Sequence, residues 1–178
     1  MAIAPGTYRF GPADGTLSVF TERTGAAAKA GHNLHIHVTA WQATLELGDS
    51  PSVALDADAT SLRVQQGTGG VHGLSEDDKD SIRKTIDAEV LLGKAIAFRS
   101  TDVRVGDGGR IEGHGELTLA GATAPVAFGV VIADDGRVTG GAMVKQSDWG
   151  IEPYSTLFGT LKVVNDVKIA IDAQLQSL

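Results

Sequence analysis

The chain has 178 residues, of which 42% are hydrophobic and 21% charged, and this composition is typical of one soluble globular domain with a buried core. Its 22 acidic and 15 basic residues give a formal net charge of −7, so we expect neither a nucleic-acid nor an anionic-membrane partner, since both require a basic surface. The absence of cysteine excludes disulfides, thiolate nucleophiles and cysteine-ligated metal centres.

The first residues, MAIAPGTYRF, lack the basic region and apolar stretch of a secretion signal. Nowhere does the sequence approach the roughly 20 consecutive apolar residues that span a bilayer. With Met1 as the natural start, we therefore expect a cytoplasmic protein that does not span a membrane. We expect residues 1–178 to form a single domain.

Apolar and polar residues alternate along most of the chain, which predicts β-strands with one face toward a core and one toward water. Gly-, Asp- and Pro-rich turns separate these strands, and Asp135-Gly136 is typical of a two-residue hairpin. The short connections predict antiparallel pairing. The alternating segments are 16–22, 33–38, 41–47, 52–58, 61–65, 95–100, 110–119, 125–133, 137–145 and 166–175.

One segment follows the periodicity of a helix instead. Residues 75–91 place Ile82, Ile86 and Val90 at helical spacing, and acidic residues occupy the expected first turn, where they favour the helix dipole. Ser75 is the predicted N-cap, because its hydroxyl can accept a hydrogen bond from a free backbone N–H. We expect one amphipathic helix in an otherwise β protein.

Strands with one dry face close into a barrel or stack as a sandwich, and the pattern alone does not separate the two. Small residues on the dry faces, such as Gly113, Gly115 and Gly140, leave volume inside a barrel or make room for large neighbours in a sandwich. A barrel of about eight strands is wide enough to be filled by side chains or to hold one small ligand. The pattern favours the barrel with a ligand cavity.

Four segments together resemble the YceI-like family of lipid- or polyisoprenoid-binding proteins, and their order and spacing fit across nearly the whole chain. They are YRFGPADGTLSVFTERTG, AIAFRSTDVRV, GHGELTLAGATAPVAFGV and SDWGI. The resemblance implies an all-β fold with one helix, built as an extended antiparallel lipocalin-like β-barrel. It also implies a long hydrophobic ligand inside the barrel, such as a polyisoprenoid, an isoprenoid quinone or a fatty-acid derivative, and no known reaction.

The candidate ligand-binding residues are large apolar side chains, each of which also suits ordinary core packing. Aromatic residues are only 5% of the chain, so their positions are informative. Arg99 and Ser100 are candidate partners for a polar head group. We expect a hydrophobic small molecule as partner, no catalytic residue, no metal and no cofactor, and the sequence leaves a homodimer open. The candidates are Phe20, Leu34, Ile36, Trp41, Leu45, Leu55, Phe98, Leu117, Phe128, Val130, Trp149 and Phe158.

The histidines suggest the main alternative function, a metal-dependent enzyme. His35 and His37 share a strand face, and a His-x-His pair can donate two ligands to zinc, iron or copper. A third ligand would have to come from His32, His72 or His114, and nothing in the sequence brings one of these close. The favoured interpretation places the pair on the solvent face of the strand, opposite its apolar residues.

Two acidic pairs are candidates for catalytic carboxylates, which need a cleft and shifted pKa values. Asp56 and Asp58 alternate with apolar residues on a wet strand face, and Asp134 and Asp135 precede a turn glycine, so neither pair is favoured. The sequence holds no phosphate-binding loop or nucleophile elbow. We predict a non-catalytic protein that binds, transports or sequesters a long hydrophobic ligand, with a metal-dependent enzyme or a β-sandwich interaction module as alternatives.

Overall fold

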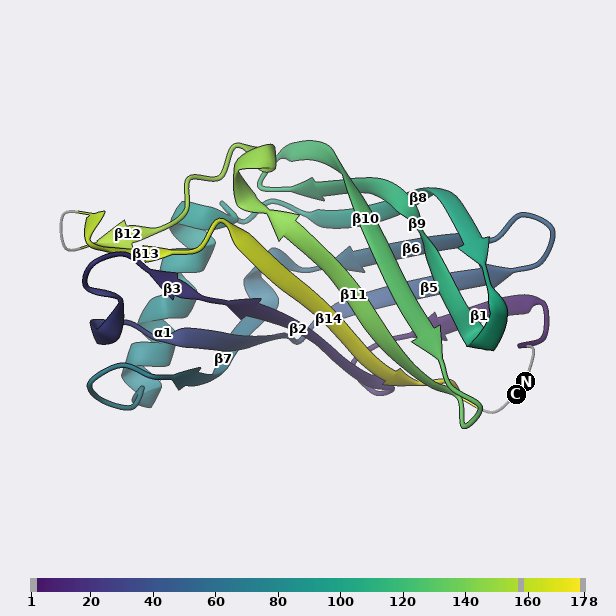
Figure 1. Ribbon diagram of the computed structural model, residues 1–178, viewed down its shortest axis with the longest axis horizontal. Helices are drawn as coiled ribbons and strands as arrows, with labels where there is room; N and C mark the ends of the chain where they lie inside the picture. The colour runs from purple at the N-terminus through teal and green to yellow at the C-terminus, as the bar shows by residue number, and fades with distance from the viewer. Residues whose placement is uncertain (1–2, 157–158, 177–178) are drawn as a thin grey trace.

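The computed structural model describes residues 3–156 and 159–176, over which eleven strands form one continuous antiparallel sheet (Figure 1). The sheet curls into a half-barrel around an apolar interior, because alternate residues of each strand are apolar and point to the same side. In spatial order its strands are β1 (Gly6–Phe10), β5 (Trp41–Leu47), β6 (Ser52–Ala57), β8 (Ile96–Val105), β9 (Arg110–Leu119), β10 (Ala122–Ile132), β11 (Arg137–Lys145), β14 (Asp166–Gln174), β2 (Gly15–Thr21), β4 (Asn33–Val38) and β7 (Leu62–Thr68).

This architecture confirms the predicted fold class of antiparallel strands with one helix. A single continuous sheet also means that the alternative of two stacked sheets is wrong. Every segment predicted from alternation forms a strand, and the Asp135-Gly136 turn joins β10 to β11, with Gly136 at a φ of 82°. Periodicity did not single out β1, nor the short strands of a second sheet, β12 (Ser155–Thr156), β13 (Leu161–Val163) and β3 (Arg23–Thr24).

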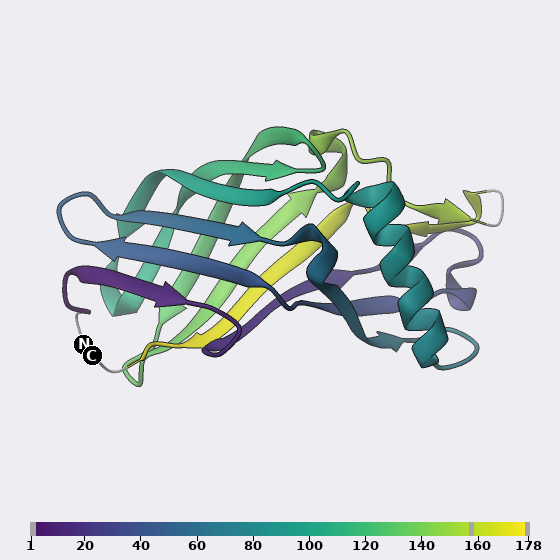
Figure 2. The same ribbon diagram turned by 180° about the vertical axis from the view of Figure 1, so that it is seen from behind.

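The predicted helix forms where its pattern placed it. Helix α1 (Glu76–Thr85) continues into a π-helical turn at Ile86–Val90. Ser75 caps it as expected, because its hydroxyl accepts from the N–H of Asp78 at 3.1 Å while the Asp78 carboxylate accepts from the N–H of Ser75 at 2.9 Å. The helix crosses one end of the curled sheet beside β7, at the same end as β12 and β13 (Figure 2). Within the described residues, no helix is long and apolar enough to cross a bilayer.

Side chains fill part of the interior. Ile111 is 0% exposed, and large residues from β1, β5 and β10 pack in the same cluster. Gly115 is small for a specific reason: a Cβ there would lie 2.4 Å from the ring of Phe98, so the glycine makes room for this aromatic side chain. Small inner residues therefore serve packing in this part of the interior.

The sheet does not close on itself. Its two outer strands are β1 and β7, and among the described residues no hydrogen-bonded ladder joins them. Tyr8 and Phe10 of β1 nevertheless share one hydrophobic cluster with Leu62 and Val64 of β7. The two ends of the sheet are linked where β4 passes into β5 and β6 passes into β7, because the N–H of Thr39 donates to the carbonyl of Ser61 and the N–H of Asp58 donates to the carbonyl of Ala40, both at 2.9 Å.

Candidate ligand-binding cavity

A cavity of about 480 Å³, here called the inner cavity, lies inside the half-barrel beneath α1. Its volume falls within the range of about 300–1,000 Å³ that is common for small-molecule sites. The walls come from alternate positions of strands that are distant in sequence, and nearly all of them are aliphatic. Representative wall residues are Leu17 and Val19 of β2, Leu34 and Ile36 of β4, Leu117 of β9 and Ile169 of β14.

Helix α1 and its π-helical turn form the lid of the inner cavity. Ile82, Ile86 and Val90, which define the apolar face of the predicted helix, all line the cavity. No residue of α1 or of the π-helical turn is fully buried, although Ile82, Ile86 and Val90 pack, partly buried, against the core cluster as well as lining the cavity. Since most helix stability in proteins comes from burial of an apolar face, we expect this lid to be held less firmly than a helix with a fully buried face.

Two residues that line the inner cavity are exposed, and they lie on α1 and on the segment before β12. Ser81 of α1 and Tyr154 line the cavity and are also exposed, Tyr154 by 42%. These two elements lie at the same end of the molecule in both ribbon views (Figures 1 and 2). A ligand that enters there passes polar side chains before it reaches the aliphatic walls.

One polar side chain lines the inner cavity while being almost wholly buried. Gln146 is 8% exposed and begins the 3-10 turn Gln146–Trp149, directly after β11. Its side-chain Nε2 donates to the backbone carbonyl of Val164 at 3.2 Å. Its backbone is fixed as well, because its N–H donates to the carbonyl of Asn165 at 2.9 Å.

The sequence-predicted residues divide between the cavity and the packed interior. Leu34, Ile36, Leu55 and Leu117 line the inner cavity. Trp41, Leu45 and Phe98 are buried and do not line the inner cavity.

Three of the other predicted residues lie in packed surroundings. Phe128 packs edge-on against Phe98 with ring centroids 5.5 Å apart, and Val130 packs partly buried against the core cluster. Trp149 is buried in a second cluster, where its indole N–H donates to the carbonyl of Leu117 at 2.7 Å. Phe158 lies outside the described residues.

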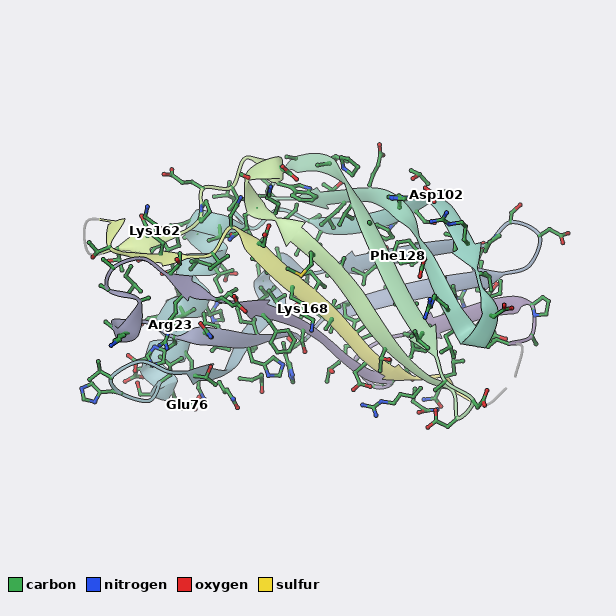
Figure 3. All side chains as sticks on the ribbon, viewed as in Figure 1. Arg23, Glu76, Asp102, Phe128, Lys162 and Lys168 are labelled. Atoms are coloured by element: carbon green, nitrogen blue, oxygen red, sulfur yellow. The ribbon has the colours of Figure 1, made fainter. Side chains whose placement is uncertain are left out.

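The structure corrects the expected position of Phe20. Because β2 directs Leu17 and Val19 into the inner cavity, Phe20 falls on the opposite face of the strand. There it stacks on His35 with ring centroids 4.5 Å apart, and the Lys168 ammonium lies 5.8 Å from its ring centroid (Figure 3). These residues line a trough of about 850 Å³ on the outer surface of the sheet, here called the outer trough.

The paired histidines lie in the outer trough and face away from the inner cavity, as the favoured interpretation predicted. His35 shares a hydrogen bond of 3.1 Å with the Ser18 hydroxyl, and its ring meets that of His37 edge-on at 4.8 Å. The pKa of His37 is lowered, first by its partial burial and secondly by the neighbouring His35. Among the residues that the structure describes, no three His, Asp or Glu side chains gather as a metal site requires.

The polar candidates make local surface contacts. Arg99 forms an exposed ion pair with Asp56 at 2.9 Å, and the Ser100 hydroxyl accepts from the backbone of Val53 at 2.9 Å; none of these lines the inner cavity. Asp58 instead accepts hydrogen bonds from Thr60, which lower the pKa of its carboxyl. The Asp135 carboxylate accepts from the backbone N–H of Arg137 at 3.0 Å, within the hairpin turn.

Comparison with known proteins agrees with this geometry. The family model of the YceI-like domain matches residues 8–175. This chain belongs to the YceI-like family. Among solved structures, BcnA of Burkholderia cenocepacia is similar with a TM-score of 0.65 at 13% identity, covering 93% of this chain and 98% of that one. The Campylobacter jejuni YceI protein is similar with a TM-score of 0.51 at 12% identity, covering 80% and 85% respectively. No curated protein matches the chain.

Sequence reasoning on this YceI-like chain missed Gln146. It directly precedes the SDWGI segment and follows a strand, where a glutamine is typical of an exposed turn. Only the path of the 3-10 turn, which folds back over the end of the sheet, directs the residue inward. Many other cavity residues were missed as well, and among them Leu17 and Val19 carried a signal in their alternation with polar neighbours.

Proposed function

We propose that this protein binds a long hydrophobic molecule in the inner cavity and acts as a non-catalytic carrier or sequestering protein. The observation that carries the proposal is an aliphatic cavity of about 480 Å³ under a helix whose apolar face lines the cavity and includes no fully buried residue. Membership of the YceI-like family supports the same conclusion, since its resemblance implied a polyisoprenoid, isoprenoid quinone or fatty-acid derivative.

Burial of the ligand tail supplies the driving force. Each methylene removed from water contributes about 0.8 kcal/mol, so a long isoprenoid tail contributes on the order of 10 kcal/mol before the costs of association and ordering. A single hydrogen bond to a head group adds about 1 kcal/mol. The tail therefore dominates affinity, and the head group governs selection among ligands with similar tails.

Lipid analysis of the purified protein tests the proposal. Native mass spectrometry after gentle purification, or after incubation with a total lipid extract, is expected to show one bound lipid-sized molecule, which extraction then identifies. Wild-type protein that carries no lipid and takes none up would contradict the proposal.

A matched pair of variants locates the bound molecule. Ala57 lines the inner cavity, whereas Ala54 lies on the opposite face of the same strand, β6. We expect Ala57→Phe to fill cavity volume and lower lipid occupancy at least about tenfold, because the ring takes the place of the ligand tail. Ala54→Phe is expected to retain full occupancy. Equal occupancy in both variants would place the ligand elsewhere.

A further inference from the structure

We infer that the inner cavity selects amphiphiles with an uncharged, hydrogen-bonding head group and excludes their anionic counterparts, and that Gln146 is the head-group partner. This inference rests on the proposed function and narrows its ligand class. The candidate ligands that remain are alcohols, phenols and quinones with long tails. Ionised fatty acids and prenyl phosphates are no longer candidates. The geometry that carries it is a buried amide set among aliphatic walls.

The amide of Gln146 has hydrogen-bonding capacity to spare. A glutamine side chain has two N–H donors and an oxygen with two lone pairs. One donor is used by the carbonyl of Val164, and among the described residues no partner contacts the second N–H or Oε1. Because Gln146 lines the cavity, a ligand hydroxyl or carbonyl that reaches these free positions can pair with the amide and gain affinity.

The cavity has no cationic side chain to pair with a negative charge. Among the described residues that line it, none is Arg, Lys or His, and the only polar ones are Thr21, Ser81, Thr85, Gln146 and Tyr154. On the lid, Arg83 is paired with Asp80 and Asp87 at 3.0 and 3.1 Å and does not line the cavity. An ionised head group would therefore enter unpaired, which proteins do not tolerate without a large loss of affinity.

Three probes with the same kind of tail test this selection in wild-type protein. Geranylgeraniol is neutral and polar, geranylgeranoate is ionised at neutral pH, and phytane has no head group. We expect titration calorimetry to give the tightest Kd for geranylgeraniol and a Kd for geranylgeranoate that is weaker by more than about a hundredfold. Equal or tighter binding of geranylgeranoate would overturn the inference. Failure of all three probes to bind would instead overturn the proposed function.

Substitution of the amide tests its role. Gln146→Leu is expected to weaken geranylgeraniol binding by about fivefold to tenfold, the equivalent of one hydrogen bond, and to leave phytane binding intact. Retained phytane binding also shows that the variant is folded. Gln65→Leu, on the exposed surface of β7, is the matched control and is expected to change neither Kd. An unchanged preference for geranylgeraniol over phytane in Gln146→Leu would overturn the assignment of this residue.

Discussion

His37 shows how the face of a strand decides what a side chain can do. The residue alternates with inward-facing aliphatic neighbours on β4, and so it reaches the outer trough beside His35 and Phe20. Partial burial there disfavours the charged imidazolium, and a second imidazole at 4.8 Å adds to the effect. The pKa of His37 is therefore lowered, and protonation of this residue works against the folded state.

This pKa shift predicts a pH dependence of stability. Since the pKa of His37 is below 6.5 in the folded protein, the unfolded chain binds the proton more readily, and stability falls as the pH drops below about 6.5 until it reaches the folded pKa. We expect His37→Gln to reduce this loss of Tm between neutral and mildly acidic pH, measured by thermal unfolding. His72→Gln, at an exposed site, is the control and should keep the wild-type profile. Parallel profiles for all three proteins would contradict the prediction.

At the scale of elements, the lid is held by contacts that are individually weak. Its N-terminus depends on the reciprocal hydrogen bonds of Ser75 and Asp78, and its surface on weak ion pairs such as Lys84 with Asp80 at 2.8 Å. Its apolar face meets the inner cavity. The end cap is therefore expected to make a larger share of the helix's stability than it would in a helix with a fully buried face.

Removal of the cap tests this dependence. We expect Ser75→Ala to destabilise α1 by about 1 kcal/mol and to raise amide hydrogen exchange across 79–90, with little change in the sheet. Thr60→Ala, in the 3-10 turn before β7, serves as a hydroxyl-removing control away from the lid. Unaltered exchange in α1 after loss of the cap would show that the helix is held by other contacts.

Sequence patterns predicted the strands and the helix well, but they did not predict which apolar residues line the cavity and which pack in the core. The two-residue alternation of 33–38 and the helical spacing of Ile82, Ile86 and Val90 are local properties, which the fold preserves. Whether an apolar residue faces a void or a packed neighbour depends on the opposite wall, which is distant in sequence. For this reason Leu34 and Trp41 had the same signal, although one lines the cavity and the other packs in the core.

For the whole molecule, a ligand that fills the hollow interior adds to the free energy of unfolding. A ligand that binds only the folded state at a free concentration of about 100 times its Kd adds about 2.7 kcal/mol of stability. We therefore expect geranylgeraniol to raise Tm by about 5–10 °C in a domain of this size and to slow amide exchange in α1. Ala57→Phe should show little of this shift. An equal shift in that variant would mean that the stabilisation does not come from the inner cavity.

The outer edges of β1 and β7, which no ladder joins among the described residues, bear on how wide a ligand the interior can hold. In a fully closed barrel, strand number and stagger fix the radius, so the width changes only with topology. Here the backbone link between the two ends of the sheet is confined to the junctions at residues 39–40 and 58–61. The radius is therefore not fixed by a complete ring of ladders, and this suits the fold to guests of different girth.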